Sequence, residues 1–250
     1  MSLYDVKGNV IAFSGASVND LSSLNGKVWL ALGDSYTSAS ASAYTDGVTP
    51  STIGVWYDLA TSLGMTLYSY GIVSSTIRYS TNGSDGYSYQ PMVTRVDELI
   101  TDHQHEADNV GLITFMGGLN DAESFIGTLD STDRSTIYGA CHQIFNKLSK
   151  AFPNAKIVVI LQPVSANGTA KDNFDNIQNS IYPAQLKQRV VKEVAEFYGL
   201  PICDCCFNWY TPTNPNHLAT IWGDDKLHLS FIGRKKLTEK LVKTLEETFV

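Results

Sequence analysis

The chain has 250 residues, of which 43% are hydrophobic and 17% charged; this length and composition suit one globular domain with a substantial core. Its net charge of -7, without an extended Lys/Arg cluster, argues against a nucleic-acid partner, and no apolar run approaches the roughly 20 residues that span a bilayer. The residues after Met1 are polar and mixed, so we expect no Sec signal and a chain that is cytoplasmic or exported by another route.

Short apolar runs alternate with helical periods along the chain. Residues 1–25 fit neither pattern and are predicted to form an N-terminal arm, a short hairpin or a linker. The first run, 27–32, ends at a glycine and is too short for a helix, so it predicts a strand buried on both faces. Similar runs occur at 65–70, 110–116, 157–161 and 200–203.

Between these runs, apolar residues recur at helical spacing. The periods cover 56–63, 137–148, 186–197 and 237–245, with Ser230 as a candidate N-cap of the last helix. Strands that alternate with helices predict an α/β fold, a three-layer α/β/α sandwich around a five-stranded parallel sheet. In such sheets the functional groups gather beyond the carboxyl ends of the strands.

Three polar segments follow this rule. Gly33-Asp34-Ser35 comes directly after the first strand, Gly117-Gly118-Leu119-Asn120-Asp121 follows the third, and Asp225-Lys226-Leu227-His228 lies near the C-terminus. Considered alone, Ser35 is more often a turn or cap residue, and Asn120 could serve a left-handed turn. A serine hydroxyl becomes an effective nucleophile only beside a base such as an imidazole, which this set supplies.

Together with Gly71 after the second strand, these segments occur in the same order as the motifs of the SGNH/GDSL hydrolases, and the chain resembles that family. The resemblance implies a flavodoxin-like SGNH hydrolase domain over residues 26–250. It also implies a serine esterase or acylhydrolase that uses no cofactor, with Ser35 as nucleophile, His228 as base and Asp225 as the acid that orients His228. Asp224 is a competing acid that the family spacing disfavours.

The resemblance further implies three oxyanion-hole donors: the backbone N–H of Ser35, the backbone N–H of Gly71 and the side-chain amide of Asn120. The chain departs from the family pattern in the motif that contains Gly71. Ser69 occupies the position, two residues before Gly71, where the family often has asparagine.

The expected partner is a small-molecule or glycan ester. An acyl group on a carbohydrate is the favoured substrate, because loops 36–50 and 79–90 are polar and tyrosine-rich. The aromatic residues near the strand ends could stack on sugar rings or form small satellite cores; they are Tyr36, Tyr44, Tyr79, Tyr87, Tyr89, Trp209, Tyr210 and Trp222. A lipid or thioester acylhydrolase is an alternative. A catalytically silent glycan-binding module on the same fold is another.

The histidines and cysteines of the chain do not follow the spacing of a known metal site. No His-Glu-x-x-His motif is present, and the cysteines do not form the two Cys-x-x-Cys motifs of a zinc framework, so we expect no metal. Cys141 and the Cys203, Cys205, Cys206 cluster are interpreted as buried thiols. The sequence does not indicate an oligomeric state.

Overall fold

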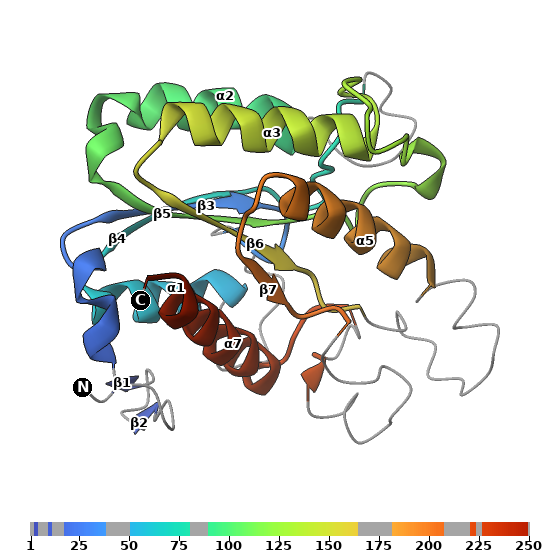
Figure 1. Cartoon of the computed structure of the whole chain (residues 1–250). Helices are drawn as coiled ribbons and strands as arrows, with labels where there is room; N and C mark the ends of the chain where they lie inside the picture. The colour runs from blue at the N-terminus through green and yellow to red at the C-terminus, as the bar shows by residue number, and fades with distance from the viewer. Residues whose placement is uncertain are drawn as a thin grey trace.

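A five-stranded parallel sheet forms the centre of the molecule (Figure 1). The sheet contains β3 (Val28–Gly33), β4 (Thr66–Gly71), β5 (Val110–Met116), β6 (Lys156–Leu161) and β7 (Ile202–Asp204). These bounds confirm the five strands predicted from the apolar runs. The computed structural model describes residues 3–4, 10–11, 18–38, 51–80, 90–164, 182–207, 221–223 and 227–249.

The order of the strands is β4-β3-β5-β6-β7. After β3 the chain forms β4 on one side of it, then crosses to form β5 on its other side. This is the flavodoxin-like order, with a switch point at the carboxyl ends of β3 and β5, where such folds place their ligands. The arrangement confirms the predicted fold class and positions the residues after β3 and β5 at the expected edge.

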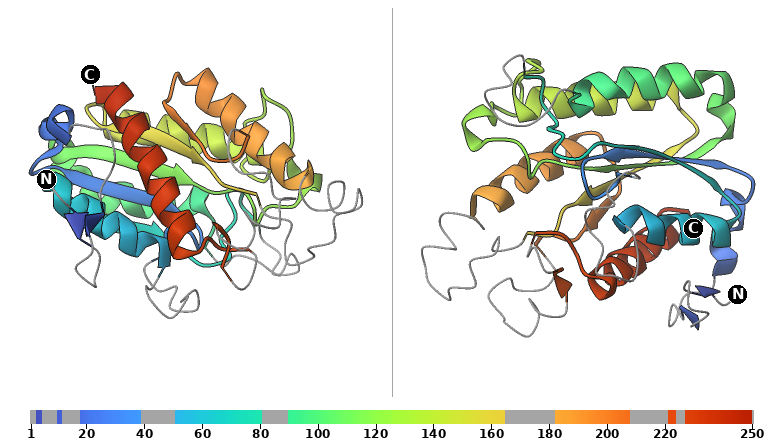
Figure 2. Two further views of the ribbon diagram at one scale, coloured as in Figure 1. Left: turned by 90° about the horizontal axis from the view of Figure 1, so that it is seen from below. Right: turned by 180° about the vertical axis from the view of Figure 1, so that it is seen from behind.

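Helices cover both faces of the sheet, and Figures 1 and 2 show the three layers. One face packs against α2 (Met92–His103), α3 (Ile137–Ala151) and α5 (Tyr182–Phe197). The other packs against α1 (Ser51–Leu63), α7 (Phe231–Phe249) and the 3₁₀ helix η1 (Val18–Leu24). Two further 3₁₀ segments, η3 (Gln104–Asn109) and η4 (Glu123–Phe125), flank β5 in the sequence.

Strand β3 shows why these apolar runs become central strands. Leu30 and Leu32 belong to the core beneath α2, α3 and α5, whereas Trp29 and Ala31 belong to the core beneath α1 and α7. All four are completely buried. Because successive side chains of a strand point to opposite faces, a strand covered on both faces must be apolar at every position.

Helix α2 was not among the predicted helices. Its buried residues include Met92, Val93, Val96 and Leu99, which follow helical spacing, but the polar residues between them dilute the pattern. The helix begins after Pro91, whose missing N–H suits the first turn. The predicted cap of the last helix is confirmed, because the Ser230 Oγ accepts a hydrogen bond from the Gly233 N–H at 3.1 Å.

Before the sheet, β1 (Leu3–Tyr4) and β2 (Val10–Ile11) form a short antiparallel pair. In η1, Leu21 and Leu24 are buried in the same core as Trp29. The domain boundary after residue 25 remains a prediction.

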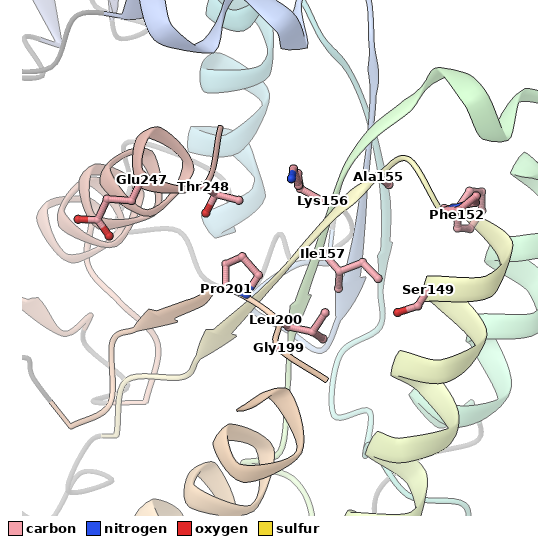
Figure 3. Close-up of a pocket in the computed structure, with 11 residues that line it drawn as sticks. Ser149, Phe152, Ala155, Lys156, Ile157, Gly199, Leu200, Pro201, Glu247 and Thr248 are labelled. Atoms are coloured by element: carbon pink, nitrogen blue, oxygen red, sulfur yellow. The ribbon is translucent and has the colours of Figure 1, made fainter. Parts of the chain in front are cut away.

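A cavity of about 510 Å³ lies at the amino-terminal edge of the sheet, where β6 and β7 begin (Figure 3). Ser149, Lys156 and Pro201 are among its lining residues. Parallel strands place their carboxyl ends at the opposite edge, so this cavity lies away from the Gly33–Ser35 segment.

Candidate active site

The Gly33–Ser35 segment leaves the sheet in a tight turn. The Asp34 carbonyl accepts hydrogen bonds from the Thr37 N–H at 3.0 Å and the Thr37 hydroxyl at 3.1 Å, and the Asp34 Oδ1 accepts from the Tyr36 N–H at 3.0 Å. A Cβ on Gly33 would lie 2.4 Å from both the Met116 carbonyl oxygen and the Thr37 Oγ1, so only glycine fits here. The turn fixes Ser35 at the carboxyl end of the central strand.

His228 meets Ser35 at this edge, although the two residues are 193 positions apart in sequence. The Ser35 Oγ lies 2.9 Å from the His228 Nε2. The exposed fractions of Ser35 and His228 are 9% and 7%, so the contact is largely shielded from water. The structure therefore brings the predicted nucleophile and the predicted base into direct hydrogen-bonding contact.

Backbone pairing holds the His228 segment in place. Trp222 and Leu229 form an antiparallel bridge, and the Gly223 N–H donates to the His228 carbonyl at 2.7 Å. The Tyr36 hydroxyl donates to the Leu227 carbonyl at 2.6 Å, and its ring centroid lies 5.3 Å from that of His228. Tyr36 thus connects the turn that contains Ser35 to the segment that contains His228.

The predicted acid Asp225 and its competitor Asp224 lie outside the described residues, in the gap at 224–226. Asp225 as the acid that orients His228 stays a prediction.

Asn120 lies at the same edge, after β5. Its side-chain Nδ2 donates to the Ser75 carbonyl at 3.0 Å and approaches the Asp34 Oδ2 at 3.5 Å. In this loop the left-handed conformation belongs to Gly118, with φ +115°, and Asn120 does not adopt it. Asn120 therefore does not supply the left-handed conformation that the alternative interpretation required. Its amide hydrogen-bonds to the loop after β4 and lies close to the Asp34 carboxylate.

Gly71 is the last residue of β4, and its N–H points to the Ser69 Oγ at 3.3 Å. A Cβ there would lie 2.2–2.4 Å from backbone atoms of Thr37 and Ser38, so this glycine allows the turn that contains Ser35 to pack against β4. Three residues later, Ser74 has φ +61°, a left-handed conformation that non-glycine residues rarely adopt.

Ser74 is a candidate functional residue that the sequence did not predict. Within the described chain, the backbone N–H groups of Ser35 and Ser74 donate to no acceptor. Ser74 directly precedes Ser75, whose carbonyl holds Asn120. A strained backbone next to such a site is a recognised mark of function, but a serine in sequence gives no sign of a positive φ.

A model of the GDSL-like lipase/acylhydrolase family matches residues 31–236, a range that contains every predicted site residue. The chain belongs to the GDSL-like lipase/acylhydrolase family. It is accordingly a hydrolase that acts on ester bonds. A comparison with curated protein sequences gives no match.

Solved structures share the fold of this GDSL-family chain. A protein from Lactobacillus plantarum has a TM-score of 0.67 and 21% identity, over 90% of this chain and 99% of that one. A carbohydrate acetylesterase from Sinorhizobium meliloti has a TM-score of 0.53 and 15% identity, over 89% and 97%. A mutant acetylxylan esterase from Geobacillus stearothermophilus has a TM-score of 0.51 and 13% identity, over 88% and 94%.

Arg95 holds two backbone segments of the GDSL-family site together. The sequence did not predict this residue. It is 3% exposed on α2, and its guanidinium donates to the Gly33 carbonyl at 2.9 Å, to the Ser75 Oγ at 2.5 Å and to the Tyr70 carbonyl. One planar guanidinium thus joins the end of β3 to the loop after β4. A single arginine in an unremarkable helix carries no sequence signal for this role.

Burial dominates the electrostatics of the site. It raises the pKa of Asp34 to about 6, against the lowering effect of hydrogen bonds from the Tyr36 N–H and Gln162 and of the nearby Arg95 charge. Burial likewise raises the pKa of Asp121 to about 6, although the N–H groups of Ile77 and Arg78 bind its carboxylate. Both carboxyl groups act as buried acceptors that connect active-site loops.

Two of the aromatic residues considered for sugar stacking are buried in this GDSL-family structure. Tyr36 is 2% exposed and Trp222 is 5% exposed, so both are structural. Tyr79 is half-buried beneath the Arg134 guanidinium, which lies 3.9 Å from its ring centroid. The others lie outside the described residues; they are Tyr44, Tyr87, Tyr89, Trp209 and Tyr210.

The described residues contain no group of three or more His, Cys, Asp or Glu side chains arranged to hold a metal ion. All four cysteines are buried free thiols. In the ranges that the structure describes, no helix is both long and apolar enough to cross a membrane.

Proposed function

We propose that this GDSL-family hydrolase is a serine esterase that forms an acyl-enzyme on Ser35 with His228 as general base. The observation that carries the proposal is the 2.9 Å contact between the Ser35 Oγ and the His228 Nε2. This distance is within the range that direct proton transfer requires. The same contact argues against a catalytically silent binding module, which has no need for a shielded serine–histidine pair.

The reaction follows from this pair. His228 takes the hydroxyl proton as the Ser35 Oγ attacks the ester carbonyl carbon, and then returns the proton to the departing alkoxide. Water attacks the acyl-enzyme while His228 takes one of its protons. The carboxylic acid leaves and Ser35 recovers its proton, so one ester and one water give one acid and one alcohol.

His228 accepts a proton at Nε2 only while its Nδ1 carries the other proton. Asp225 is proposed to accept a hydrogen bond from that Nδ1–H and so to fix the tautomer and the ring orientation.

The negative charge that develops on the carbonyl oxygen needs fixed donors. We assign this role to the backbone N–H of Ser35 and the side-chain amide of Asn120. The 3.5 Å approach of the Asn120 Nδ2 to Asp34 is long for a hydrogen bond, so one amide proton is available for an incoming oxyanion. For the third donor, Gly71 is the residue that the sequence predicts, and the Ser74 N–H is favoured because Gly71 already points to Ser69.

For the substrate, we propose an acyl group on a carbohydrate. The polar, tyrosine-rich sequences of residues 36–50 and 79–90 support this class. So does the fold shared with a carbohydrate acetylesterase. A lipid or thioester acylhydrolase is the alternative outcome of the test.

The test combines turnover of p-nitrophenyl acetate with labelling by a fluorophosphonate probe. The wild-type chain should do both, and Ser35→Ala should do neither while keeping its melting temperature. Ser149→Ala, at the cavity of Figure 3, is the matched control and should behave as wild type. Turnover by Ser35→Ala equal to that of the wild type would remove Ser35 as nucleophile.

The substrate class is tested with three esters: acetylated xylan, a phospholipid and an acyl-thioester. Preferred release of acetate from the xylan supports a carbohydrate substrate. A higher kcat/KM on either of the other two would replace that assignment and leave the serine mechanism intact.

A further inference from the structure

Two glutamine side chains that the mechanism does not use lie completely buried beneath the active-site edge. Gln162 is the first residue after β6, and Gln188 lies on α5. Both are 0% exposed. Because burial of an amide costs free energy unless its hydrogen bonds are made, their partners indicate what they are for.

Gln162 bridges two active-site loops. Its Nε2 donates to the Asp34 Oδ2 at 2.8 Å, and its Oε1 accepts from the Leu119 N–H at 3.1 Å. A carboxylate oxygen only accepts and a backbone N–H only donates, so the amide orientation follows from its partners. Asp34 directly precedes Ser35, and Leu119 directly precedes Asn120.

Gln188 holds this bridge from the side of α5. Its Oε1 accepts from the Gln162 backbone N–H at 2.7 Å, and its Nε2 donates to the Gly117 carbonyl at 2.9 Å. The Gln188 Nε2 also lies 3.5 Å from the Gln162 Oε1. The position of Gln162 is therefore set by both the strand end and the neighbouring helix.

We propose that Gln162 is a positioning residue that fixes the separation between Ser35 and the Asn120 amide, an inference that rests on the proposed esterase function. The long contact between Asn120 and Asp34 cannot fix this separation alone. The short bond from Gln162 to Asp34 and its bond to the Leu119 backbone connect the two loops directly. Misplacement of a reacting group by 1 Å costs up to roughly a hundredfold in rate.

The loop keeps other support when Gln162 is changed. The Lys187 Nζ donates to the Leu119 carbonyl at 2.9 Å and to the Asp121 carbonyl at 2.7 Å, one on each side of Asn120. Loss of the Gln162 bridge should therefore shift Asn120 without unfolding its loop.

The first experiment replaces the amide by an apolar side chain of similar size. Gln162→Leu should lower kcat roughly ten- to a hundredfold and change KM less than about twofold. Gln143→Leu is the control, because it also removes a side-chain amide that bonds a neighbouring loop. The Gln143 Nε2 donates to the Thr132 carbonyl at 3.0 Å, and Gln143 lies on α3 outside the site. Rates are expressed per active site titrated with the fluorophosphonate, so unfolded protein does not enter kcat.

The second experiment asks whether Gln162 acts through Asn120. If it does, the Asn120→Ala/Gln162→Leu double variant should be within about threefold of Asn120→Ala alone, since the position of an absent amide cannot matter. Multiplied effects of the two changes would overturn the inference. A wild-type kcat in Gln162→Leu would also overturn it.

The third experiment uses Gln162→Glu, which keeps the shape of the side chain. A protonated carboxyl can donate to Asp34, but an ionised one faces it with like charge. The kcat of Gln162→Glu relative to wild type should therefore fall as pH rises, whereas the ratio for Gln162→Leu should stay flat. A flat ratio for both variants would mean that the hydrogen bond to Asp34 does not matter. Absence of turnover in the wild-type chain itself would instead count against the esterase function.

Discussion

Replacement of Asn120 by alanine separates a catalytic role from a merely structural one. The change removes the proposed oxyanion donor, and loss of one such donor lowers kcat roughly a hundred- to a thousandfold, or about 3 to 4 kcal/mol of transition-state stabilisation. It also removes the 3.0 Å hydrogen bond to the Ser75 carbonyl. A bond of this kind contributes about 1 kcal/mol to stability, which corresponds to about 2–4 °C in melting temperature for a chain of this size.

The two roles therefore predict different results. An oxyanion donor predicts a large fall in kcat, little change in KM and a small fall in melting temperature. A structural bridge alone predicts the small fall in melting temperature with kcat reduced by less than about tenfold. Steady-state kinetics with p-nitrophenyl acetate and thermal unfolding by circular dichroism measure both quantities on one preparation.

Asn120→Asp sharpens the comparison. It keeps the volume of the side chain but places acceptors against the Ser75 carbonyl and the Asp34 carboxylate. We expect it to lose at least as much kcat as Asn120→Ala and more stability, because the new charge is unpaired. A kcat near that of the wild type in either variant would remove Asn120 from the oxyanion hole.

Further predictions concern the catalytic pair, the strained loop and a buried carboxyl. Ser35→Ala and His228→Ala should each abolish turnover, and the double variant should be no worse than either, because the two residues act as one unit. Ser74→Gly should keep kcat and raise the free energy of unfolding by up to about 1 kcal/mol in urea denaturation, since glycine tolerates φ +61°; lower stability would show that the serine is not strained there. The folded-state pKa of Asp121, about 6, is above its ordinary value of 3.8, so its share of stability is lost as pH rises from about 4 to about 6. Asp121→Asn should flatten that decline by on the order of 1 kcal/mol per pH unit, and an unchanged slope in urea titrations across this range would refute the assignment.

The sequence alone determined the layers of the fold and the edge at which chemistry is expected. Apolar runs such as 27–32 report burial on both faces of a sheet, which is a local property of consecutive residues. The carboxyl ends of parallel strands share one edge, so the segments around Ser35, Gly71 and Asn120 could be placed together before any contact was known. His228 was assigned to the same site because its segment follows the others in the motif order of the SGNH/GDSL hydrolases.

Tertiary structure alone decided how these residues are held. Arg95 reaches Gly33 across 62 positions, and Gln162 reaches Asp34 across 128. Such partners have no periodic pattern, because each depends on one side chain meeting one distant backbone or carboxylate. The left-handed conformation of Ser74 also has no signal in the sequence, since the loop around it imposes that conformation. Local periodicity therefore predicts the framework, and the long-range hydrogen bonds that orient the site appear only when the chain is folded.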